Sequence, residues 1–69
     1  MNLDYYKQQY KDIMKSTESK IKKSFRFAQL MSEMEKDFNI PIQNNSKYNN
    51  ENADIIAMYK LLNNSKNNK

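Results

Sequence analysis

The chain contains no glycine, and its only proline is Pro41. These two residue types interrupt helices most strongly, so residues 3–38 form a long run of acceptable helix formers without an interruption. Asn2 or Asp4 can cap the start of a helix there. The stop signal is Asn39, a residue type that tolerates the left-handed cap position, with Pro41 two residues beyond it. The sequence predicts an all-α fold that begins with this helix.

Residues 16–19, with the sequence STES, interrupt the apolar pattern of the predicted helix. Two interpretations are open. The segment is either a turn, with Ser16 capping a second helix, or a polar layer within one continuous helix. We favour one long helix over residues 3–38, with a kink as an option.

Two apolar stripes lie along this predicted helix. At about 100° per residue, one face collects a first stripe, expected to form the core: Leu3, Tyr6, Tyr10, Ile13, Met14, Ile21, Phe25 and Ala28. From Phe27 onward the apolar positions are rotated by roughly 100°. This second stripe comprises Phe27, Leu30, Met31, Met34 and Phe38.

A linker is predicted over residues 39–49, because Pro41 favours an extended Ile40 and the surrounding Asn and Ser residues favour turns. A shorter helix should follow over about residues 50–62, capped by Asn49 or Asn50. Residues 1–62 would then form a single small domain. The polar tail, residues 63–69, is expected to be disordered.

The apolar residues of this predicted hairpin exceed what two helices can bury against each other. The second helix is apolar over most of its circumference, which is typical of a helix buried on more than one side. A chain of 69 residues without cysteine has few ways to stabilise a small core other than association. We therefore predict that a homo-oligomer, most simply a dimer, completes the hairpin. Its predicted interface consists of Phe27, Leu30, Met31, Met34, Phe38, Ile56, Tyr59 and Leu61.

The positive charge is concentrated at the two ends of the chain, and the net charge is +4. On a continuous helix, four basic residues would lie within about 60° of one another, facing away from the first apolar stripe. These residues are Lys11, Lys15, Lys22 and Arg26, and they form the candidate nucleic-acid contact. Acidic residues interrupt the strip, and Phe25 and Phe27 point about 160° apart, so they cannot form one base-stacking surface. Nucleic-acid binding is therefore the weaker alternative, and membrane binding is not expected.

Catalysis is not expected. The chain has no His and no Cys, which removes the commonest general base and the commonest transition-metal ligands. Glu33 and Asp37 lie one helical turn apart, but a solvated acidic surface explains them better than an active site. We predict no catalytic residue, no metal site and no cofactor.

The sequence thus favours a small interaction protein that binds a larger macromolecule, most simply a protein, and inhibits or regulates it by occupying a surface. The alternatives are a nucleic-acid-binding regulator and a structural protein that assembles with itself. Abundant Lys, Asn and Ile, all with A/T-rich codons, indicate an AT-rich genome, such as that of a low-GC bacterium, its phages or its plasmids. The N-terminus lacks the pattern of a signal peptide, so a cytoplasmic location is expected.

Overall fold

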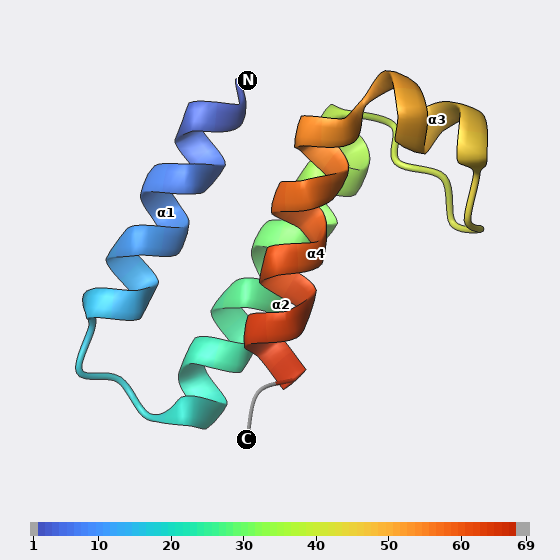
Figure 1. The fold of residues 1–69 in the computed structure, drawn as a ribbon. Coiled ribbons are helices and arrows are strands. Elements are labelled where there is room, and N and C mark those ends of the chain that lie inside the picture. Colours follow the sequence, from blue (N-terminus) through green and yellow to red (C-terminus); the bar gives the residue numbers. More distant parts are fainter. Residues whose placement is uncertain (1, 68–69) are drawn as a thin grey trace.

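The computed structural model describes residues 2–67, which form four helices and no strand. The helices are α1 (Leu3–Lys15), α2 (Lys20–Asp37), α3 (Ser46–Glu51) and α4 (Ala53–Asn67). The prediction of an all-α fold is confirmed. In Figure 1, α1, α2 and α4 run alternately down, up and down as a three-helix bundle, and α3 lies to one side near the start of α4.

The predicted long helix over residues 3–38 is instead two helices, α1 and α2, that reverse direction at residues 16–19. Ser16 ends α1, and its hydroxyl oxygen accepts a hydrogen bond from the backbone N–H of Glu18. Ser19, rather than Ser16, caps α2 by accepting from the backbone N–H of Lys22 at 3.3 Å. Serine hydroxyls that bond to nearby backbone groups offer the chain an alternative to helix, which explains the break without glycine or proline.

The two outer helix ends agree with the sequence signals. Asn2 caps α1 by accepting from the backbone N–H of Tyr5 at 3.2 Å. Asn39 takes the left-handed conformation, with φ of 52°, so its predicted role as the end of the helix is confirmed. The backbone N–H of Ile40 then donates to the carbonyl oxygen of Glu35 at 3.1 Å, which is the long hydrogen bond of a Schellman motif.

The second half of the chain is more helical than predicted. Residues 46–49 of the predicted linker belong to α3, which is capped by Asn45. Asn49 and Asn50, the predicted caps of the next helix, lie inside α3 instead. The predicted helix over residues 50–62 corresponds to α4, which begins later and continues to Asn67. Residues 63–67 of the predicted disordered tail are therefore helical, and residues 68–69 lie outside the described residues.

A single core lies between α1, α2 and α4. Eight apolar side chains are buried in it: Tyr6, Ile13, Phe27, Leu30, Met31, Met34, Met58 and Leu62. The four from α2, which we call the inner stripe, are Phe27, Leu30, Met31 and Met34. They were predicted to lie at an interface between chains, and the structure instead packs them within one chain, because the reversal at residues 16–19 places α1 beside them.

Two tyrosine hydroxyls fasten α2 to its neighbours. Tyr6 on α1 donates to the carboxylate of Asp37, and Tyr59 on α4 donates to the carboxylate of Glu35. Burial, reinforced by the bonded carboxylate, raises the pKa of Tyr6 well above its ordinary value and raises the pKa of Tyr59 to about 12. Asp37, which was predicted to belong to a solvated acidic surface, and the nearby Glu35 therefore have structural roles.

Candidate binding surfaces

Two large apolar side chains stand exposed on the outer side of α2. Ile21 is 70% exposed and Phe25 is 72% exposed. They lie one helical turn apart and therefore on the same side of the helix, opposite the inner stripe. We call them the outer pair. Both were predicted to be core residues, together with Met14, which is also exposed, and Ala28, which is half-buried.

Basic residues are concentrated at the same end of α2 as the outer pair. The first turn of α2 carries Lys20, Lys22 and Lys23 and no acidic residue. Because the N-terminal end of a helix is its positive end, this placement is electrostatically unfavourable for the isolated chain. The basic end of α2 therefore favours an acidic neighbour.

The four residues of the predicted nucleic-acid strip do not form a single row. Lys11 and Lys15 belong to α1, whereas Lys22 and Arg26 belong to α2, which runs in the opposite direction. Arg26 forms a salt bridge with Glu18, the only salt bridge among residues 2–67. The Arg26 guanidinium is the main reason that the pKa of Glu18 lies below its ordinary value. The break at residues 16–19 thus divides the strip and commits one member to a partner in the same chain.

A second exposed surface follows the junction of α1 and α4. The hydroxyl of Ser65 on α4 donates to that of Tyr10 on α1 at 3.5 Å, which marks where the helices meet. Met14 lies one turn after Tyr10, and Leu61 lies one turn before Ser65, so both apolar side chains border the junction. They are 52% and 41% exposed, respectively.

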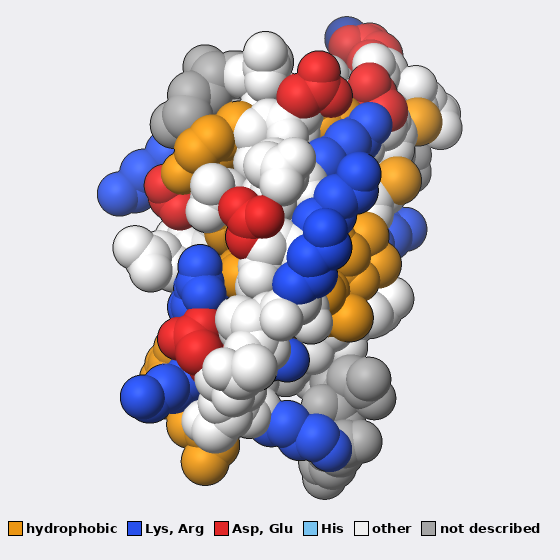
Figure 2. Space-filling model, turned by 90° about the vertical axis from the view of Figure 1, so that its left-hand side faces the viewer, with side chains coloured by type: hydrophobic (Ala, Val, Ile, Leu, Met, Phe, Trp, Pro, Cys, Tyr) orange, Lys and Arg blue, Asp and Glu red, His pale blue; other side chains and the backbone are white. Residues whose placement is uncertain are grey.

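Basic side chains accompany this junction. The exposed lysines of α1 are Lys7, Lys11 and Lys15, at spacings of four residues. Figure 2 looks at the molecule from the side of α1 and shows a band of basic side chains beside an apolar area. Together with Met14 and Leu61, these lysines define what we call the α1/α4 face.

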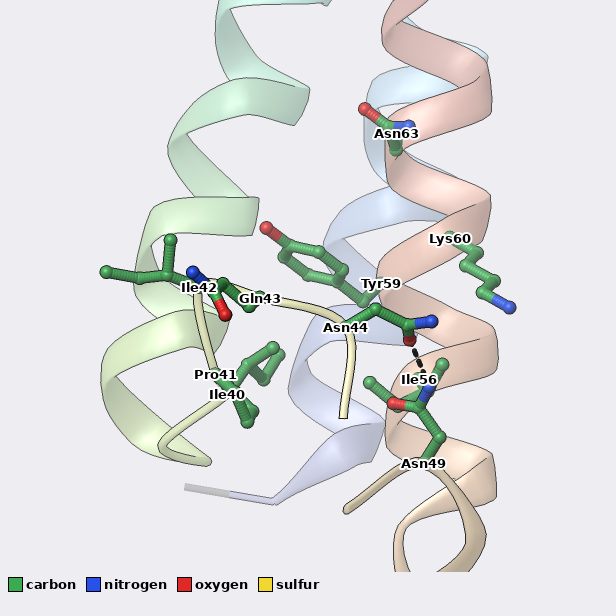
Figure 3. Close-up of a pocket in the computed structure, with 10 residues that line it drawn as sticks. All are labelled: Ile40, Pro41, Ile42, Gln43, Asn44, Asn49, Ile56, Tyr59, Lys60 and Asn63. Carbon is green, nitrogen blue, oxygen red and sulfur yellow. Dashed lines mark hydrogen bonds between the residues drawn. The ribbon is translucent and has the colours of Figure 1, made fainter. Parts of the chain in front are cut away.

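A hollow of about 200 Å³ lies where the chain between α2 and α3 passes α4. Its lining is largely apolar: Ile40, Pro41, Ile42, Ile56 and Tyr59. Polar residues, including Asn63 and the single basic residue Lys60, complete the wall. Figure 3 shows Tyr59 reaching from α4 toward this segment, with Asn44 and Asn49 joined by a hydrogen bond of 2.7 Å. We call this feature the linker hollow.

The remaining predicted interface residues are only partly available. Phe38, Ile56 and Tyr59 are half-buried, so of the eight only Leu61 is exposed. The outer pair was not among the predicted site residues, and of the residues that line the linker hollow only Ile56 and Tyr59 were. Exposed Phe25 could have been identified only by knowing that the chain reverses before α2, because its spacing from Ile21 suits a core position equally well.

Within residues 2–67, no three His, Cys, Asp or Glu side chains lie close enough to hold a metal ion. No helix in this part of the chain has both the length and the apolar character needed to cross a membrane. Comparison of the chain with models of protein families, with curated proteins and with solved structures gave no match.

Proposed function

We propose that this protein is a non-enzymatic interaction protein that binds a larger, acidic protein through the α1/α4 face and regulates it by occupying its surface. The observation that supports this proposal is the combination of exposed apolar side chains with lysines that form no salt bridge among residues 2–67. Met14 and Leu61 can supply apolar contact, while Lys7, Lys11 and Lys15 can supply charge complementarity. The proposal assigns the chain no catalytic residue and no cofactor, and places it in the cytoplasm.

A protein partner explains this surface better than a nucleic acid. A phosphate backbone would engage the lysines, but it would leave Met14 and Leu61 without apolar partners. An acidic protein surface with an apolar centre would engage both kinds of side chain. Like-charged lysines at spacings of four residues also destabilise an isolated helix slightly, and an acidic partner would relieve that repulsion.

The test is capture of a partner by the tagged full-length chain from a nuclease-treated lysate of the organism that encodes it. Calorimetry with the purified partner would follow. We expect one acidic protein to bind with micromolar or tighter affinity. Leu61→Ser and the double variant Lys7→Gln/Lys11→Gln should each weaken binding, by removing apolar contact and charge respectively. Phe25→Ser, on another side of the bundle, is the matched control and should leave binding unchanged.

Salt dependence separates this proposal from the nucleic-acid alternative. Affinity for the protein should decrease moderately with salt and should keep the contribution of Leu61 at high salt. Three results together would contradict the proposal in favour of nucleic-acid binding: capture that depends on nucleic acid, affinity that falls steeply with salt, and unchanged binding by Leu61→Ser.

A further inference from the structure

We propose that a second copy of this chain docks on the side of the bundle that carries the outer pair and the linker hollow. In this antiparallel dimer, Phe25 of each chain inserts into the linker hollow of the other. This inference concerns a surface distinct from the α1/α4 face and does not rest on the function proposed for that face.

The outer pair and the linker hollow belong to one continuous surface. Asn63 lines the hollow, and Lys66, one turn further along α4, accepts a hydrogen bond through its carbonyl oxygen from Ser24 at 3.1 Å. Ser24 directly precedes Phe25, so the junction of α2 and α4 leads from the hollow to the outer pair. No residue of α1 lines the hollow, and Figure 1 shows the segment between α2 and α3 on the side of α4 away from α1.

The hollow suits an aromatic ring in size and in chemistry. An apolar cavity of about 150 Å³ is sufficient to bind benzene. The linker hollow has a volume of about 200 Å³, and Pro41, Ile56 and Tyr59 contribute to its apolar lining, as Figure 3 shows. Phe25 cannot reach its own hollow, because twelve residues of α2, about 18 Å of helix, separate it from the end of that helix. The ring must come from another molecule.

A two-fold axis makes the contact reciprocal. In an isologous dimer, the insertion of Phe25 of one chain into its partner implies the same insertion in the other direction. The surface between the two contact points carries Ala28 and Ser32 on the same side of α2 as Phe25. These small side chains allow the two copies of α2 to approach each other closely at the axis.

Charge favours the antiparallel orientation. The end of α2 beside the outer pair carries Lys20, Lys22 and Lys23 in its first turn. The other end of α2 carries Glu35 and Asp37 but also Lys36, and the neighbouring α3 carries both Lys47 and Glu51, so this end has no comparable excess of positive charge. Lys60, which lines the hollow, adds a further basic residue there. Antiparallel pairing keeps the two basic ends apart, whereas parallel pairing would place them side by side.

The available area suits a stable dimer. The molecule measures 38 × 23 × 16 Å, so side-by-side pairing along its length offers about the 800 Å² per partner that a typical specific interface buries. Burial would also cover the three most exposed large apolar side chains among residues 2–67: Ile21, Phe25 and Ile42.

Sedimentation equilibrium of the full chain, from low micromolar to near-millimolar concentration, is the first test. We expect a dimer. Phe25→Ser and Ile42→Ser should each weaken dimerisation by roughly tenfold to a hundredfold, because each removes apolar contact at an otherwise unchanged fold. Met14→Ser, on the α1/α4 face, is the matched control and should dimerise as the wild type does. Circular dichroism would verify that every variant remains helical.

Disulfide trapping tests the geometry, since the chain has no native cysteine. The single variants Phe25→Cys and Ile42→Cys should form disulfide-linked dimers rapidly when mixed and slowly when either is oxidised alone. A chain that stays monomeric over the whole concentration range would overturn the proposal. Linkage of Phe25→Cys to itself as fast as to Ile42→Cys would equally overturn it, because it would indicate a different pairing.

Discussion

The inner stripe and the outer pair of α2 have similar hydrophobicity and opposite surroundings. Phe27 is 2% exposed and contacts the ring of Tyr10, with 5.7 Å between the ring centres, whereas Phe25 is 72% exposed. Both residues are phenylalanine and they lie two positions apart in the sequence, so residue type does not explain the difference in exposure. Apolar spacing therefore identifies the candidate core sides of a helix, and the connection between helices decides which of these sides packs in the core.

The largest expected effect comes from truncation within the inner stripe. Met34 is completely buried, so Met34→Ala should reduce the free energy of unfolding by about 2–5 kcal/mol. A chain of this length has a total of roughly 3–10 kcal/mol, and the variant should be largely unfolded at moderate temperature. Thermal and urea unfolding followed by circular dichroism would measure the loss.

The matched control is Phe25→Ala, measured at a concentration low enough to keep the chain monomeric. We expect its free energy of unfolding to stay within about 0.5 kcal/mol of that of the wild type. Equal losses for Met34→Ala and Phe25→Ala would show that the two sides of α2 are not distinct in solution.

A smaller effect on the free energy of unfolding is expected at residues 16–19, the break between α1 and α2. Ser19→Ala removes the side chain that accepts from the backbone N–H of Lys22, and should cost about 1 kcal/mol of unfolding free energy. Ser32→Ala, at an exposed position within α2, is the control and should be neutral or slightly stabilising, because alanine is the better helix former. If Ser19→Ala stabilised the protein, the break would not depend on this cap.

The smallest effect concerns the hydroxyl that joins the far end of α2 to α4. Tyr59 donates to Glu35 only while protonated, and its pKa is raised to about 12 from an ordinary value near 10. The unfolded chain therefore loses this proton first, so the contribution is complete below pH 10 and is lost as the pH rises toward 12.

Urea unfolding at several alkaline pH values would measure this contribution. Wild type and Tyr59→Phe should differ most at pH 7 to 9, and the difference should shrink between pH 10 and 12. If the difference in the free energy of unfolding stayed constant across this range, ionisation of the Tyr59 hydroxyl would not contribute to the pH dependence of stability.

Sequence reasoning succeeded where the determining interactions are local. Asn2 and Asn39 act within one helical turn of their positions. Residue type and spacing alone identified Asn39 and gave Asn2 as one of two candidate caps, beside Asp4. It was wrong at residues 16–19, because a serine that caps a new helix and a serine within a continuous helix differ by only about a kilocalorie. Because the chain reverses there, the inner stripe lies in the core and not at the predicted interface.

The candidate surfaces were hidden for a related reason. Ile42 is separated from Ile56 and Tyr59 by α3, and the Asn-rich sequence of α3 gave no apolar period to indicate a helix. The hydrogen bond from Tyr59 to Glu35 likewise joins residues that are distant in sequence. Contacts of this kind follow from the path of the whole chain and not from any segment of it.

Methionine makes up three of the eight core residues: Met31, Met34 and Met58. Oxidation to the sulfoxide would make each of them polar and incompatible with the core, yet an oxidant reaches them only when the bundle opens. Exposed Met14 should react with peroxide at once, while the fold persists. The slower rate of sulfoxide formation at the core methionines would then report how often this small bundle opens.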